Sequence, residues 1–195
     1  MALFSSDQFK NLSRVRKENS IKGPIPYLEP YSKDVHYLVP STPECDFPYS
    51  CIPDNVTPCG PITLPSDDLS IVDPELEIWL SKRQTVLLNL GSLYGIDPPH
   101  ARELARGLQL VLDQHPNIQI YWKLMMKDGL AKTPSEAWQV DRTVVEMLSS
   151  AIQSDQVRIV GWIKAEPGKI LMHRNVICSV HHGGANSYYE AVMYV

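Results

Sequence analysis

The chain has 195 residues, a length that suggests one domain or one domain with an appendage. It is 44% hydrophobic and 21% charged, a composition typical of a globular protein. Its formal net charge is -4, so we expect no basic face for nucleic acid. The apolar runs are far shorter than the ~20 residues that span a bilayer, and residues 1–5 do not resemble a signal peptide. We therefore expect a cytoplasmic protein. A membrane anchor that lies outside these residues could not be recognised from them.

The N-terminal part of the chain has little periodic pattern. Residues 1–22 contain one apolar-sided helical stretch, which we interpret as a remnant helix of a preceding domain. Residues 23–73 hold most of the 16 prolines and only short extended pieces, such as residues 35–39. So long a stretch without regular structure is uncommon inside a compact domain, which predicts an interdomain linker, with a strap on the surface of a neighbouring domain as the alternative. Its three cysteines form no CxxC pair, which disfavours a zinc site. An odd cluster of three is expected to be reduced, with a disulfide inside the loop as the alternative.

From residue 74 onward, apolar runs that suit buried strands alternate with helical patterns. Asp73 followed by Pro74 is a typical helix start. The alternation predicts an α/β fold with a Rossmann-like parallel sheet and helices on both faces. Ligands of such sheets bind at the carboxyl ends of the strands. The expected strands cover residues 85–90, 118–124, 157–160 and 176–180. The expected helices cover residues 98–114, 134–154, 167–172 and 186–193, and the helix that starts at Asp73 carries Leu76, Trp79 and Leu80.

The segment with the most chemical character is residues 180–190, which read VHHGGANSYYE and link a strand to a helix. Gly183 and Gly184 allow a ligand to approach the backbone closely. Asn186 and Ser187 would lie at the helix N-terminus, where free N–H groups and about half a unit of positive charge favour phosphate. This segment therefore predicts an anion site, although a capped helix with a glycine hinge remains an alternative.

Two further side chains extend this site. His182 can donate to a phosphate oxygen, and Glu190, one turn into the helix, can accept from a ribose diol. A metal site on His181 and His182 is disfavoured, because adjacent histidines point in different directions and no third ligand is nearby. A dinucleotide-binding dehydrogenase is also disfavoured, since no GxGxxG follows a strand.

Trp162 followed by the HGGxNSxxE pattern of residues 182–190 resembles the donor-binding signature of the UDP-glycosyltransferase superfamily, and HHGGANS looks most like its fungal members. The resemblance begins near residue 35 and is most specific in residues 157–191. It implies a two-domain GT-B fold whose C-terminal domain binds the nucleotide sugar. Residues 74–195 then resemble a truncated UDP-sugar donor-binding domain.

The resemblance also implies a role for each matching residue. Trp162 would pack on uracil, and His182 would hold the diphosphate together with the Asn-Ser pair. The Gly-Ser pair that follows the first strand would also lie close to the phosphates. Glu190 would hold the ribose. A core tryptophan at residue 162 and a plain turn at residues 91–92 are the alternatives. The residues implied for UDP-sugar binding are Gly91, Ser92, Trp162, His182, Gly183, Gly184, Asn186, Ser187 and Glu190.

The chain departs from the family pattern in three respects. Ala165 stands where plant members have glutamine, and the stretch from Trp162 to His182 is two residues longer than theirs. The chain ends at Val195, before the family's Gly-x-Pro turn and sugar-gripping Asp/Glu-Gln pair. The family's catalytic histidine belongs to the N-terminal domain, so no catalytic residue is assigned here, and no His–Asp pair is expected to replace it. The other histidines are expected at the surface: His36, His100, His115 and His173.

These observations predict a UDP-dependent hexosyltransferase that passes a sugar to a hydroxyl of a small, lipophilic acceptor with inversion. The UDP-sugar is a substrate, and no cofactor, metal or nucleic acid is expected. Two alternatives remain open: a non-catalytic donor-binding subunit of a split glycosyltransferase, and an inactive truncated gene product. Neither the sugar nor the acceptor follows from the sequence.

Overall fold

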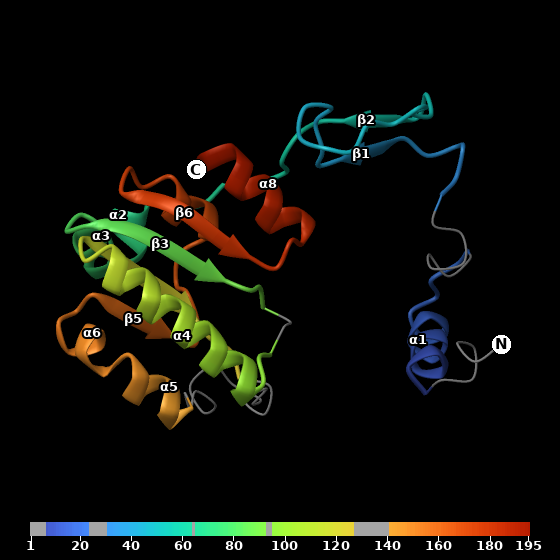
Figure 1. Ribbon diagram of the computed structural model, residues 1–195. Coiled ribbons are helices and arrows are strands. Elements are labelled where there is room, and N and C mark those ends of the chain that lie inside the picture. The colour runs from blue at the N-terminus through green and yellow to red at the C-terminus, as the bar shows by residue number, and fades with distance from the viewer. Residues whose placement is uncertain (1–6, 24–30, 64, 93–94, 127–140) are drawn as a thin grey trace. The chain divides into compact units, whose positions relative to one another are not determined.

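The computed structural model describes residues 7–23, 31–63, 65–92, 95–126 and 141–195 (Figure 1). The chain forms two compact units. One combines Met1–Leu38 with Cys51–Thr57, and the other combines Val39–Ser50 with Pro58–Val195. The proposed roles of residues 1–22, 23–73 and 74–195 as remnant helix, linker and donor domain stay predictions.

The helix expected near the N-terminus is present as α1 (Asp7–Glu18). Its exposed face carries an ion pair of 2.8 Å between Arg14 and Glu18, and its apolar Leu12 and Val15 are each 39% exposed. Further along, β1 (Tyr37–Val39) and β2 (Val56–Pro58) form a two-stranded sheet. The proline-rich stretch therefore holds more regular structure than its composition indicates.

The centre of the second unit is a four-stranded sheet in the order β5-β4-β3-β6, in which every neighbouring pair is parallel. The predicted Rossmann-like α/β fold is confirmed, because strands alternate with helices along the chain. The strands are β3 (Gln84–Asn89), β4 (Ile118–Lys123), β5 (Val157–Val160) and β6 (Val176–His181). The helices are α2 (Leu69–Val72), α3 (Pro74–Leu80), α4 (Pro98–Gln114), α5 (Arg142–Met147), α6 (Ser149–Gln153), α7 (Pro167–Leu171) and α8 (Ala185–Tyr194).

Helices cover both faces of this sheet, which gives three layers (Figure 1). Successive side chains of a strand point to opposite faces, so Leu88 joins the core under α4, α5 and α6, whereas Leu87 joins the core with α2, α3 and α7. In β4, Trp122 and Tyr121 divide between the two cores in the same way. The two central strands, β3 and β4, are largely apolar because helices cover both of their faces, whereas the edge strand β6 has exposed residues at Ile177, Cys178 and Val180.

The helix expected over residues 134–154 differs from the observed structure. Residues 134–140 lie outside the described residues, and the described part is divided into α5 and α6 at Leu148. Leu148 has φ −100° and ψ 12° and is fully buried, so the chain leaves helical geometry where this side chain enters the core. The short helix α2 was not expected either.

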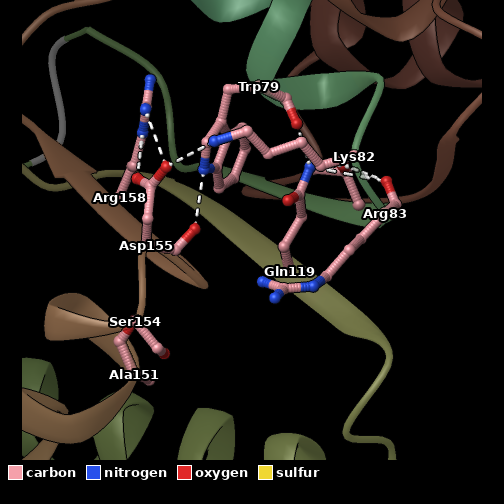
Figure 2. Close-up of polar contacts among 9 residues, drawn as sticks. Trp79, Lys82, Arg83, Gln119, Ala151, Ser154, Asp155 and Arg158 are labelled. Carbon is pink, nitrogen blue, oxygen red and sulfur yellow. Dashed lines mark hydrogen bonds and ion pairs between the residues drawn. The ribbon is translucent and has the colours of Figure 1, made fainter.

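Polar contacts at the amino edge of the sheet join α3 to the strands (Figure 2). The Trp79 indole N–H donates to the Asp155 carbonyl at 2.8 Å, and the buried Gln119 amide donates to the Trp79 carbonyl at 2.9 Å. The Asp155 carboxylate accepts from Arg158 at 2.7 Å and from Lys82 at 2.9 Å. These contacts lie about 20 Å from the carboxyl edge, since a six-residue strand rises about 3.3 Å per residue. Their role is therefore structural.

Among the described residues, no helix has the length and apolar character needed to cross a bilayer. The four cysteines, Cys45, Cys51, Cys59 and Cys178, are free thiols.

Candidate functional site

The carboxyl edge of the sheet contains a change in the direction of strand order between β3 and β6. The chain runs from β3 to β4 and β5 on one side, and then returns to place β6 on the other side of β3. Asn89, the last residue of β3, pairs in register with His181, the last residue of β6. Such a switch point opens a crevice at the carboxyl ends of the two strands, where α/β proteins bind ligands.

The residues that follow these two strands meet in this crevice. Gly91 has φ +90°, and a Cβ built on it would lie 2.9 Å from Cε1 of the His182 ring. A Cβ on Gly184 would overlap Nε2 of the same ring. The imidazole therefore lies against two backbone segments that only glycine leaves open. Three predicted site residues, Gly91, His182 and Gly184, are thus brought together.

Helix α8 begins directly behind this contact. Gly184 is its N-cap, and no side chain caps it, so its first turn presents open N–H groups. Asn186 is exposed and Ser187 is half-buried in this turn. By contrast, the Gly183 N–H is already bonded to His181 Nδ1 at 3.2 Å and is not an open donor. The helix N-terminus with His182 beside it suits an anion.

Glu190 lies one turn further along α8 and is half-buried. Burial raises the pKa of this carboxyl, and the negative charge of Glu166 raises it further. Glu190 and Asn186 both line a cavity of about 650 Å³. The acid is therefore at the edge of a space that a ligand can enter.

Trp162 follows β5 and is 55% exposed, so it is not a core residue. Lys123, the last residue of β4, places its Nζ 4.2 Å from the centroid of the indole. Lys123 is only 7% exposed, and burial lowers its pKa. The lysine therefore supports one face of an exposed ring.

The strands that carry Trp162 and His182, β5 and β6, are separated by three strand spacings of about 4.8 Å, roughly 14 Å in all.

Two adjacent tyrosines connect α8 to residues 45–46, which sequence reasoning did not connect with the site. The Tyr188 hydroxyl donates to the Cys45 carbonyl at 2.8 Å. The Tyr189 hydroxyl donates to the Asp46 carboxylate at 3.0 Å. Hydrogen bonds from the Tyr49 hydroxyl and then from the Phe47 N–H lower the pKa of Asp46. Nothing in the local pattern signals contacts between segments so far apart in the chain.

The expectation for one of the other histidines is wrong. The His173 side chain is only 7% exposed rather than at the surface, because it packs against α3, with Nε2 3.4 Å from Ser81 Oγ. His100 is exposed as expected, and its Nδ1 lies 2.7 Å from Oδ1 of Asp97, three residues earlier in the chain. Asp97 at the same time caps α4, accepting from the His100 N–H at 3.0 Å. Within the part of the chain that the structure describes, no group of three metal-ligating side chains occurs.

Comparison with known proteins gives a consistent result. No family model matches the chain. The chain is 37% identical over 188 residues to the glycosyltransferase sdnJ of Sordaria araneosa, a match covering 96% of this chain and 36% of that protein. It thus spans about a third of the relative's length.

Among solved structures, a UGT transferase from Siraitia grosvenorii in complex with UDP is 25% identical, with a TM-score of 0.50. That match covers 71% of this chain and 31% of that chain. A UDP-glucosyltransferase from Polygonum tinctorium is 20% identical, with a TM-score of 0.48, over 71% of this chain and 27% of its own. The roles of individual site residues stay predictions.

Proposed function

Because the chain belongs to the UDP-glycosyltransferase superfamily, we propose that its α/β unit binds the nucleotide part of a UDP-sugar for glycosyl transfer. The observation that carries this proposal is the contact of His182 with Gly91 and Gly184 beside the uncapped start of α8. A diphosphate in this crevice would accept hydrogen bonds from the imidazole and from the helix N–H groups. Ser92 and Gly183 would line the approach.

The base and ribose are assigned to the neighbouring residues. An exposed indole supported by a lysine offers a flat face, and stacking of a base on an aromatic ring is worth about 1–3 kcal/mol. We assign uracil to Trp162 and the ribose diol to Glu190, with Asn186 and Ser187 on the phosphates. The span of roughly 14 Å from β5 to β6 suits an extended nucleoside diphosphate.

The reaction we propose is transfer of a hexose from UDP to a hydroxyl of a small, lipophilic acceptor, with inversion at the anomeric carbon. The departing UDP is stabilised by fixed donors in the crevice, which act on charge that develops as the bond breaks. Deprotonation of the acceptor is assigned to a base outside these 195 residues. The proposal requires no metal and no further cofactor.

Binding of UDP, ADP and NAD by titration calorimetry or ligand-observed NMR tests this function. We expect weak binding of UDP, on the order of 0.1–1 mM, since association entropy offsets most of three modest contacts. Trp162→Ala and Glu190→Ala should each abolish detectable binding with the fold retained. Leu110→Ala, at an exposed position of α4, is the matched control and should bind as the wild type does. Equal or stronger binding of ADP would refute the uridine assignment.

A further inference from the structure

The cavity beside α8 has walls that the donor motif does not account for. It is lined by Asn186 and Glu190 from α8, and also by Glu166, which directly precedes α7. Other parts of its lining come from residues 61–63 and 65–66, in the stretch predicted to be a linker. The cavity therefore joins two predicted donor residues to groups from other parts of the second unit.

The charged groups around this cavity are two carboxylates and one lysine. Lys169 lines the cavity, but its Nζ forms an ion pair of 2.9 Å with Asp68, so its charge is already balanced. Glu166 lies close enough to Glu190 for its charge to raise the pKa of the Glu190 carboxyl, in addition to the effect of burial. The cavity thus presents two hydrogen-bond acceptors to a ligand that carries donors.

The aromatic part of the cavity wall is held by packing and by a hydrogen bond. The Tyr194 ring lies so close to Gly168 that a Cβ on this glycine would be 3.1 Å from Cε2, so α7 and α8 pack tightly. Tyr189, which also lines the cavity, is held through its hydroxyl by the Asp46 carboxylate. Glu190 is therefore carried by α8, and Glu166 lies at the start of α7, which packs firmly against α8.

We propose that this cavity receives the ribose of the nucleotide, and that Glu166 and Glu190 together accept hydrogen bonds from its 2′- and 3′-hydroxyls. The inference rests on the proposed function and adds a specificity-determining residue, Glu166, to it. A ribose diol supplies two donors, and a carboxylate for each satisfies both. The proline and tyrosine side chains of the cavity offer apolar contact to the furanose ring. Asn186, on the same face of α8, leads from the ribose to the diphosphate.

A ligand that lacks both hydroxyls separates this role from a structural one. We expect Glu166→Ala to weaken UDP binding about tenfold, the size of a lost hydrogen bond to a charged group. The wild-type protein should bind 2′,3′-dideoxy-UDP more weakly than UDP, and Glu166→Ala should change that affinity less than about twofold. Glu75→Ala, which removes an exposed glutamate of α3, is the control and should leave both affinities unchanged. An equal loss for the two ligands, or no loss for UDP, would overturn the inference.

The pH dependence of binding gives a second readout. Glu166→Gln keeps the shape of the side chain but removes its charge, so the pKa of Glu190 should fall. The pH below which UDP binding is lost should then shift downward from that of the wild type. An unshifted pH profile would contradict the pairing of the two carboxylates. If the wild-type protein binds UDP and neither Glu166 variant changes this binding, only the present inference is overturned. If the wild-type protein binds no UDP, the proposed function itself is overturned.

Discussion

Substitution of Gly91 by alanine tests the contact on which the nucleotide site is built. The residue has φ +90°, so an alanine there would be strained whatever space surrounds it. Backbone strain of this kind costs about 1–2 kcal/mol, partly offset by about 0.4–1 kcal/mol from the less flexible unfolded chain. The new methyl would also meet the His182 ring at 2.9 Å, and the exposed ring would move aside. We expect a small loss of stability and a large loss of binding.

Three other glycines separate strain from displacement of the ring. Gly183 has φ +76° with no atom near its built Cβ, so Gly183→Ala carries strain without the contact to His182. Gly184 has φ −64°, so Gly184→Ala displaces the ring without that strain. Gly107 lies inside α4 with open space around it, and its replacement should stabilise the helix by about 1 kcal/mol.

Thermal unfolding and UDP titration of the four variants give the readouts. Each kcal/mol corresponds to about 2–4 °C in melting temperature for a protein of this size. We expect a lower melting temperature for Gly91→Ala and Gly183→Ala and a higher one for Gly107→Ala. UDP affinity should fall about tenfold in Gly91→Ala and Gly184→Ala, the loss of one charge-assisted donor from His182, and should be unchanged in Gly107→Ala. Wild-type UDP affinity in Gly91→Ala, with unchanged NMR shifts of the His182 ring, would refute the reasoning.

Two further predictions concern the contacts that support the site. The pKa of Asp155 is about 2, chiefly because Arg158 donates to it, so its carboxylate stabilises the fold above about pH 4 and loses this effect as the pH falls toward 2. Asp155→Asn should therefore flatten the decline of urea-unfolding free energy between pH 4 and 2, and parallel curves for the two proteins would contradict this. Tyr189→Phe removes the hydrogen bond to Asp46 and should lower the melting temperature slightly and weaken UDP binding; unchanged affinity would show that the bond does not position α8.

Several elements followed from the sequence because their signals are local. The helix expected over residues 98–114 has these same bounds in the structure, since Asp97 caps it and Pro98 occupies its first turn. The strand expected over residues 157–160 also has these same bounds in the structure, because its β-branched residues favour an extended backbone. Residues 180–190 likewise indicated a strand, a glycine turn and a helix N-terminus by their order alone.

The tertiary structure decided which of these residues meet. Local periodicity cannot say that β6 lies beside β3, because strand order depends on packing between distant segments, and it is this order that brings His182 against Gly91. For the same reason the sequence did not indicate that Lys123 supports the indole of Trp162. Burial is decided in the same way: His173 is enclosed by a helix that packs beside it, although its own neighbours in the chain suggest a surface position.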